Sequence, residues 1–221
     1  MKLRRADARS VKERAIAFLE DLPKVHQRGD QPAHSGGLNV RLGRVMIDEL
    51  QTMDAPAVIE TGAGASTLLF MMLGCSSVIA IAPDEKLGRR IHQEAEDRGL
   101  DVNVLTYIND RSERALPRLA LEKQTRCQAA FIDGNHGWPS VFVDFCYLNM
   151  MMDRGAVLFI DDVHVYACAQ LMLLLQAQPE YEFVRLDGKL ATFRKATDRE
   201  FLPDWRGEPF ILMNTTGVSL G

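Results

Sequence analysis

Short apolar runs alternate with amphipathic stretches along the middle of the chain. Runs rich in β-branched and small apolar residues predict strands, and stretches with apolar residues three or four apart predict helices. The predicted strands are residues 57–60, 77–82, 102–108, 129–133 and 156–161, and the predicted helices between them are residues 66–73, 85–98, 112–122 and 139–152. This alternation is typical of parallel βαβ units, and near-continuous apolar strands are typical of a sheet covered on both faces.

Two amphipathic helices are predicted before this alternation. Ser10, followed by Glu13, matches a helix-capping box, and the helix that it begins ends at Pro23. Apolar residues then recur at helical spacing between residues 38 and 50. We expect both helices as N-terminal additions to the alternating fold.

An antiparallel hairpin is predicted after the alternation. Residues 165–178 have a helical pattern. Residues 181–186 and 190–194 then flank Asp187-Gly188, a dipeptide typical of hairpin turns. The predicted fold class is therefore α/β, with a doubly wound, mostly parallel, seven-stranded Rossmann-like sheet that is closed by an antiparallel hairpin.

The composition agrees with one globular domain. The chain has 221 residues, of which 47% are hydrophobic and 25% charged, and single α/β domains commonly run to about 200–250 residues. We assign an N-terminal helix and loop to residues 1–37, one main domain to residues 38–195, and a C-terminal tail without clear periodicity to residues 196–221.

Charge and cysteine content narrow the partners and the compartment. The formal net charge of −4 brings no global attraction to phosphate backbones, so we expect no nucleic-acid partner. None of the four cysteines forms a CxxC pair, which argues against a disulfide framework. The N-terminal segment is too charged for a secretory signal, and no apolar stretch reaches the length of a membrane span. We expect a cytoplasmic protein with no membrane partner.

A glycine-containing loop, residues 60–67 (ETGAGAST), follows the first strand of the alternation. Gly62 and Gly64 allow a ligand to approach the backbone closely. Ser66 or Thr67 can begin the next helix, whose free N–H groups favour a negative group. Thr67 stands where a dinucleotide fingerprint has its third glycine, which disfavours a nicotinamide cofactor, whereas Glu60 favours a cofactor with a cationic end. The alternative is a tight turn in a protein without a cofactor.

Three aspartates mark the ends of two neighbouring strands. Asp133 ends the fourth predicted strand, and Asp161 and Asp162 end the fifth. Neighbouring strands lie about 4.8 Å apart, and crowded carboxylates resist joint ionisation. A divalent cation, most simply Mg²⁺, would compensate their charge. The alternative is that some of them cap helices or face water, and Asp161 and Asp162 converge only if the strand ends before them.

His136 lies three residues after Asp133, on the loop at the same end of the predicted sheet. A neutral imidazole there can accept a hydroxyl proton at physiological pH. The alternative is a loop histidine that binds a backbone carbonyl.

The pattern E-x-G-x-G-x-S-T resembles motif I of class I S-adenosylmethionine-dependent methyltransferases. The similarity continues in SERALP (112–117), FIDGNH (131–136), GAVLFIDD (155–162) and the closing hairpin, and so covers residues 38–195. The resemblance implies that Glu60 and the glycines line the methionine end of the cofactor and that Asp110 and Ser112 lie beside the adenine. The residues expected to contact the cofactor are Glu60, Gly62, Gly64, Ser66, Thr67, Asp84, Asp110, Ser112 and Asp133.

One position departs from this family. Many members carry an acid at the end of the second strand, which binds the ribose hydroxyls, and here Ala82 occupies that place. Asp84 or Glu85 is left to substitute from the following loop. The departure keeps open a degenerate, non-catalytic binding module on the same fold.

The aspartates and His136 resemble the metal-dependent O-methyltransferases of the catechol and macrolide-sugar types, which take metal ligands from these strand ends. Catechol-type enzymes carry a lysine in the loop after the fourth strand, and residues 134–145 contain none. The D-x-x-H arrangement is more similar to the macrolide-sugar type, in which a histidine is the proposed base.

We therefore expect methyl transfer from S-adenosylmethionine to a hydroxyl group of a small molecule. Asp133, Asp161 and Asp162 would hold a divalent cation that lowers the hydroxyl pKa, and His136 would accept the proton. The alternatives are the non-catalytic module, a nicotinamide oxidoreductase and a metal-dependent hydroxylase. The acceptor stays open between a sugar, a polyketide and a phenol, and a homo-oligomer is one of the open assembly states.

Overall fold

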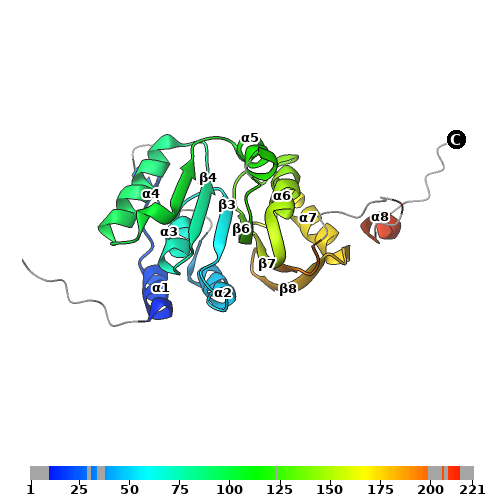
Figure 1. Ribbon diagram of the computed structural model, residues 1–221, viewed down its shortest axis with the longest axis horizontal. Helices are drawn as coiled ribbons and strands as arrows, with labels where there is room; N and C mark the ends of the chain where they lie inside the picture. The colour runs from blue at the N-terminus through cyan, green and yellow to red at the C-terminus, as the bar shows by residue number, and fades with distance from the viewer. Residues whose placement is uncertain are drawn as a thin grey trace, which may run out of the picture. The chain divides into compact units, whose positions relative to one another are not determined.

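The computed structural model describes residues 10–28, 31–33, 38–122, 124–198, 206 and 209–214 (Figure 1). The chain divides into two compact units, Met1–Asp110 and Arg111–Gly221. Strands and helices alternate in each unit. No helix within the described ranges has both the length and the apolar character that a membrane crossing requires.

The first unit begins with two helices and a short hairpin and continues as a parallel βαβαβ run. Its helices are α1 (Val11–Glu20), α2 (Val40–Leu50), α3 (Ala65–Met72) and α4 (Glu85–Asp97), and its strands are β1 (His26–Arg28), β2 (Gln31–Ala33), β3 (Ala57–Thr61), β4 (Ser77–Ile81) and β5 (Leu105–Ile108). Strands β3 and β5 pair in parallel with β4. The antiparallel β1–β2 hairpin was not predicted from the sequence.

The predicted capping box at the start of α1 is confirmed. The Ser10 hydroxyl accepts a hydrogen bond from Glu13 N at 3.2 Å, and the Glu13 carboxylate accepts one from Ser10 N at 2.7 Å. Asn39 caps α2 in the same way through Leu42 N. These caps satisfy N–H groups that a helix terminus otherwise leaves unpaired.

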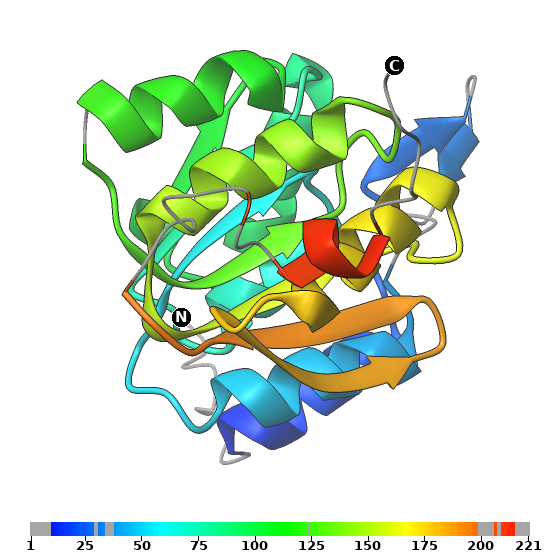
Figure 2. The same ribbon diagram turned by 90° about the vertical axis from the view of Figure 1, so that its right-hand side faces the viewer.

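The second unit carries the remaining strands. Its elements are α5 (Ser112–Pro117), a π-helical turn (Arg118–Glu122), β6 (Cys127–Ile132), α6 (Ser140–Met151), β7 (Met152–Ile160), α7 (Tyr166–Ala177), β8 (Tyr181–Asp187), β9 (Leu190–Lys195) and α8 (Pro209–Asn214). Strands β6 and β7 are parallel, and β9 pairs antiparallel with both β7 and β8. Figure 2 shows β8 and β9 as an orange hairpin.

Strands β3 to β9 are the seven strands of the predicted sheet, and the fold class predicted from the sequence is confirmed. Several predicted elements differ in their bounds, and the fifth strand, predicted over residues 156–161, is β7, Met152–Ile160. The third strand begins at Leu105, because Asp101 accepts a hydrogen bond from Asn103 N at 3.0 Å and starts a 3₁₀ turn over Val102–Val104. The helix predicted over residues 112–122 changes to a π-helical turn after Pro117, which has no N–H for the helical ladder.

A buried lysine stabilises the core of the second unit. Lys195 is 2% exposed, and its Nζ donates to the carbonyl oxygens of Asn149 at 2.7 Å and Met152 at 3.0 Å. These carbonyls lie at the C-terminal end of α6, where a positive charge is favoured. The ammonium group therefore joins the last residue of β9 to the end of this helix.

Lys195→Met is expected to lower the free energy of unfolding by about 1–3 kcal/mol, because buried carbonyl groups lose their donor. Urea unfolding measures this loss. The control is Lys86→Met on the exposed face of α4, which should change stability by less than about 0.5 kcal/mol. Equal effects of the two substitutions would show that the Lys195 contacts contribute nothing.

Candidate functional site

The glycine loop lies between β3 and α3. Gly62 has φ of 91°, a left-handed conformation that favours glycine. Its N–H donates to Ile81 O at 2.9 Å, which ties the loop to the end of β4. Gly64 N donates to the Thr67 hydroxyl at 3.0 Å at the start of α3. The turn is therefore held by one backbone and one side-chain acceptor at the carboxyl end of the parallel strands.

Glu60 presents a fully buried carboxylate beside this turn. It accepts a hydrogen bond from the Ser66 hydroxyl at 2.7 Å and another from the Thr67 hydroxyl. Both hydroxyls predicted to contact a cofactor thus bind Glu60. Both donors are neutral hydroxyls in the first turn of α3, and the N-terminus of a helix favours a negative group.

Asp84, the acid considered in place of Ala82, caps α4. Its Oδ1 accepts a hydrogen bond from Leu87 N at 2.9 Å, and its Oδ2 lies 3.6 Å from Arg90 Nη2. The side chain is still 50% exposed. The other candidate, Glu85, is bonded to Arg89 on the surface of α4.

Tyr107 fixes the loop that carries Ala82 and Asp84. Its hydroxyl donates to the carbonyl oxygens of Asp84 at 2.7 Å and Ala82 at 3.2 Å. The ring packs against Gly88 of α4, where an added Cβ would lie 2.6 Å from ring carbons. Sequence reasoning missed Tyr107, and the only signal for it was a polar aromatic residue in the third predicted strand.

The two remaining residues expected beside the adenine flank the boundary between the units. Asp110 follows β5 by two residues and is partly exposed, and Ser112 is the first residue of α5 and is 9% exposed. Each stays a predicted contact.

The three aspartates follow the ends of two strands. His136 lies beside Asp133 and Asp162, and Lys189 binds Asp161 and Asp162. Strand β6 ends at Ile132 and β7 at Ile160, and Asp161 N donates to Ile132 O at 3.0 Å. Asp162 has φ of 53°, so the chain has left the extended conformation there. The strand therefore ends before Asp161 and Asp162, which is the condition that the sequence set for their convergence.

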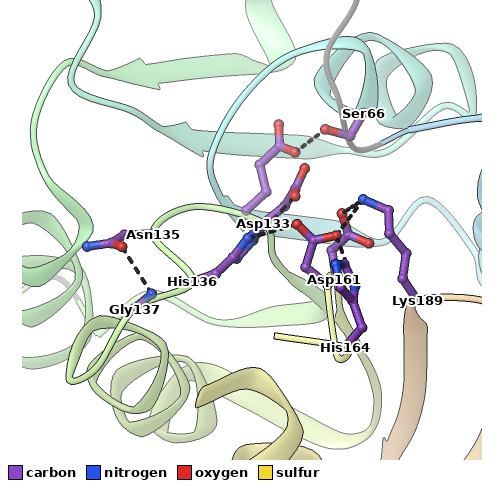
Figure 3. A network of polar contacts seen from close by, with 10 residues as sticks. Ser66, Asp133, Asn135, His136, Gly137, Asp161, His164 and Lys189 are labelled. Atoms are coloured by element: carbon purple, nitrogen blue, oxygen red, sulfur yellow. Dashed lines mark hydrogen bonds and ion pairs between the residues drawn. The ribbon is translucent and has the colours of Figure 1, made fainter. Parts of the chain in front are cut away.

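Lys189 binds two of these aspartates and was missed from the sequence. Its Nζ donates to Asp161 Oδ2 at 2.9 Å and to Asp162 Oδ1 at 2.6 Å (Figure 3). It lies in the two-residue loop between β8 and β9, after Gly188. The Asp187-Gly188 signal predicted the hairpin but not that the next side chain would meet the aspartates.

His136 lies between two carboxylates. Its Nδ1 is 3.0 Å from Asp162 Oδ2, and its Nε2 is 3.6 Å from Asp133 Oδ1. His164 Nδ1 is farther away, at 3.8 Å from Asp162 Oδ1, and its side chain is 66% exposed. The D-x-x-H spacing thus places the imidazole beside the aspartates. Both nitrogen atoms of His136 face carboxylates and not the backbone carbonyl of the alternative prediction.

Asn135 fixes the loop that carries His136. Its side-chain Nδ2 donates to Ser140 Oγ at 2.9 Å. Its Oδ1 accepts a hydrogen bond from Gly137 N at 3.1 Å, which Figure 3 shows. Ser140 in turn donates to the Glu113 carboxylate of α5. The loop that carries the imidazole is therefore held by the side chain of Asn135, which binds Gly137 and Ser140 on the far side of His136.

The cluster shifts the pKa values of its members in different directions. Burial, with a contribution from the charge of Asp133, raises the pKa of Asp161 to about 7. Burial also opposes ionisation of Asp162, but Lys189 and the nearby histidines hold the pKa of that carboxyl below its ordinary value. The contact with Asp133 outweighs burial and raises the pKa of His136.

The predicted metal set does not fit the arrangement of donors. Mg²⁺ requires near-octahedral oxygen ligands, and the Lys189 ammonium group lies between the Asp161 and Asp162 oxygens that would supply them. Within the part of the chain that the structure describes, no group of three or more His, Cys, Asp or Glu side chains is arranged to hold a metal ion. Because a lysine binds Asp161 and Asp162 and His136 lies beside Asp133, we derive no step through a metal.

The structure has a Rossmann-like sheet with a glycine turn after β3, a buried acid beside that turn, and polar residues at the carboxyl ends of β6 and β7. Residues 59–163 match a family described as a methyltransferase domain. The resemblance to class I S-adenosylmethionine-dependent methyltransferases is confirmed.

Solved structures share the fold at low sequence identity. An O-methyltransferase from Bacillus cereus in complex with SAH has a TM-score of 0.64 and 17% identity, over 88% of this chain and 93% of that chain. A protein from Klebsiella pneumoniae, proposed to be an O-methyltransferase, has a TM-score of 0.62 and 13% identity, over 88% and 93%. An rRNA methylase from Streptococcus thermophilus has a TM-score of 0.54 and 17% identity, over 69% and 95%. No curated protein sequence matches the chain significantly.

His136 is expected to stabilise the fold more at low pH than at high pH. Its folded-state pKa is raised, so the stabilisation is fully present below the unfolded pKa of about 6.5 and is lost as pH rises through the folded pKa. His136→Gln should therefore lower the free energy of unfolding near pH 6 and have a smaller effect near pH 9, as urea unfolding at each pH would measure. A pH-independent difference would contradict the electrostatic account, and His92→Gln on exposed α4 is the matched control.

Proposed function

We propose that the protein transfers a methyl group from S-adenosylmethionine to a hydroxyl group of a small molecule. The observation that carries this proposal is the His136 imidazole, with Nδ1 3.0 Å from Asp162 Oδ2 and Nε2 3.6 Å from Asp133 Oδ1, beyond hydrogen-bond distance. A hydroxyl must lose its proton as it is methylated, and a positioned imidazole can accept it. Like the fold itself, this acceptor chemistry is consistent with the O-methyltransferases among the similar structures.

The Glu60 loop fits the proposed methyl donor. A buried carboxylate held by two neutral hydroxyls matches a ligand with a cationic amino group, and the Gly62 turn leaves the backbone without a side chain there. The B. cereus structure holds SAH, the demethylated form of this donor. When bound, S-adenosylmethionine supplies a methyl group activated by a positively charged sulfur. Glu60 and the glycine turn would orient it, which is mainly a positioning effect.

Asp162 and His136 act as an orienting acid and a base. With Nδ1–H donating to Asp162 Oδ2, the imidazole holds its second nitrogen, Nε2, ready to accept a proton. The raised pKa of His136 makes it a stronger base and keeps it protonated to a higher pH. The proposed base is therefore active only once pH exceeds that pKa.

A small acceptor agrees with the charges of the cluster better than RNA does, although an rRNA methylase shares the fold. Three aspartates against one lysine and two histidines do not form a basic surface for a phosphate backbone. The net charge of the chain is −4 as well. We therefore propose a small molecule as the partner and no nucleic acid.

Gly62→Val is expected to abolish binding of S-adenosylhomocysteine, because a branched side chain would fill the turn that the ligand approaches. Isothermal titration calorimetry measures the affinity. Gly74→Val is the matched control, since Gly74 also has a positive φ, of 80°, but lies after the other end of α3. Unchanged affinity in Gly62→Val would remove the loop from the site, and no heat with the wild type would favour the non-catalytic alternative that Ala82 raised.

His136→Ala is expected to lower turnover by about 10²–10⁴-fold, which is the usual contribution of a positioned base. Screening phenols and sugars for S-adenosylhomocysteine release would first identify an acceptor. The variant should also lose the acidic limb of the pH–rate profile and keep its affinity for S-adenosylhomocysteine. The control is His164→Ala, which removes the exposed histidine of the same cluster. Retention of most activity with the same profile would exclude His136 as the base.

A further inference from the structure

We propose that Lys189 is the built-in cation of the aspartate cluster and excludes a divalent metal from it. The cluster consists of Asp133, Asp161 and Asp162. The sequence predicted Mg²⁺ for the charge compensation of these residues, and the structure has an ammonium group of the chain itself in that role at Asp161 and Asp162. The role of Lys189 in turnover rests on the proposed function, whereas its effect on metal binding does not.

The contacts of Lys189 are those of a shared counter-ion. Its Nζ lies 2.9 Å from Asp161 Oδ2 and 2.6 Å from Asp162 Oδ1, within the range of charge-assisted hydrogen bonds. Asp161 is only 1% exposed, and the Lys189 side chain is 24% exposed. Water therefore screens this pair weakly, and a buried carboxylate without a cation would be costly.

The fold places Lys189 at this position. In the antiparallel β7–β9 pairing, Ile160 is opposite Ala191, and continuing that register by two residues brings Asp162 level with Lys189. The Lys189 carbonyl oxygen also accepts a hydrogen bond from Val163 N at 3.0 Å. Both the backbone and the side chain of Lys189 thus bind the loop after β7, which holds the residue beside the aspartates.

The ammonium group and a divalent ion exclude one another. Mg²⁺ binds carboxylate oxygens at about 2.0–2.1 Å, so it would occupy the space that Nζ now holds between Asp161 and Asp162. Lys189 would then be a second positive charge beside the ion, with a backbone that holds it in place. One of the two cations must be absent.

Lys189 consequently acts as a positioning residue in the proposed reaction. It holds Asp162, and Asp162 Oδ2 lies against Nδ1 of the base His136. Without a metal ion, the imidazole of His136 alone would accept the proton of the hydroxyl group.

Binding of Mn²⁺, followed by electron paramagnetic resonance, tests the inference without any assay of methyl transfer. We expect the wild type to leave Mn²⁺ free and Lys189→Met to bind it at least about tenfold more tightly, because two carboxylates lose their cation. Adding Asp161→Asn to Lys189→Met should abolish that binding. Lys86→Met is the control and should behave as the wild type. Tight binding by the wild type that Asp161→Asn abolishes, or no binding by a folded Lys189→Met variant, would overturn the inference.

A measurement on the wild type alone covers the case in which Lys189→Met does not fold. A ligand that binds only the native state raises the free energy of unfolding, so urea unfolding in about 10 mM Mg²⁺ and in chelator should give the same value. A stabilisation by Mg²⁺ that Asp161→Asn removes would overturn the inference. Failure of the proposed function would instead appear as absent turnover or absent S-adenosylhomocysteine binding, whatever the metal result.

Discussion

Burial of the Asp161 carboxylate is the constraint on which the second unit depends. Asp161 follows directly after β7 and is almost inaccessible to solvent, so its charge needs a partner from the protein. The β8–β9 hairpin supplies that partner through Lys189, and the same ammonium group fixes Asp162. Strand ends, hairpin loop and imidazole are therefore held by one set of ion pairs.

The first unit buries a carboxylate by other means. Glu60 accepts hydrogen bonds from two hydroxyls in the first turn of α3. The two buried acids thus differ in their partners: Asp161 binds an ammonium group of the chain, whereas Glu60 accepts hydrogen bonds from two neutral hydroxyls. This difference separates the proposed donor-binding loop from the cluster that holds the proposed base.

Much of the fold could be predicted because strand burial leaves a direct record in the sequence. The apolar runs around Ile59, Val78 and Leu158 have period and length typical of buried parallel strands, and all three residues are buried. The glycine turn and the strand-end aspartates could be predicted for the same reason, because they follow directly after such runs. Lys189 and Tyr107 were not, because each acts on a residue more than twenty positions away in the chain. The sequence around Lys189 contains no pattern that distinguishes this lysine from a lysine on the surface.

The length of the β8–β9 loop has a consequence for how such proteins diverge. With two residues in the loop, the register of β9 against β7 brings a side chain of the loop level with Asp162. Inserting or deleting one residue would shift that register or rotate the side chain to the other face of the hairpin. A change in loop length, with every aspartate retained, could therefore convert a cluster closed by its own lysine into one open to a metal ion. Within this fold, the number of residues in the β8–β9 turn would then determine whether the aspartates bind a lysine of the chain or a metal ion.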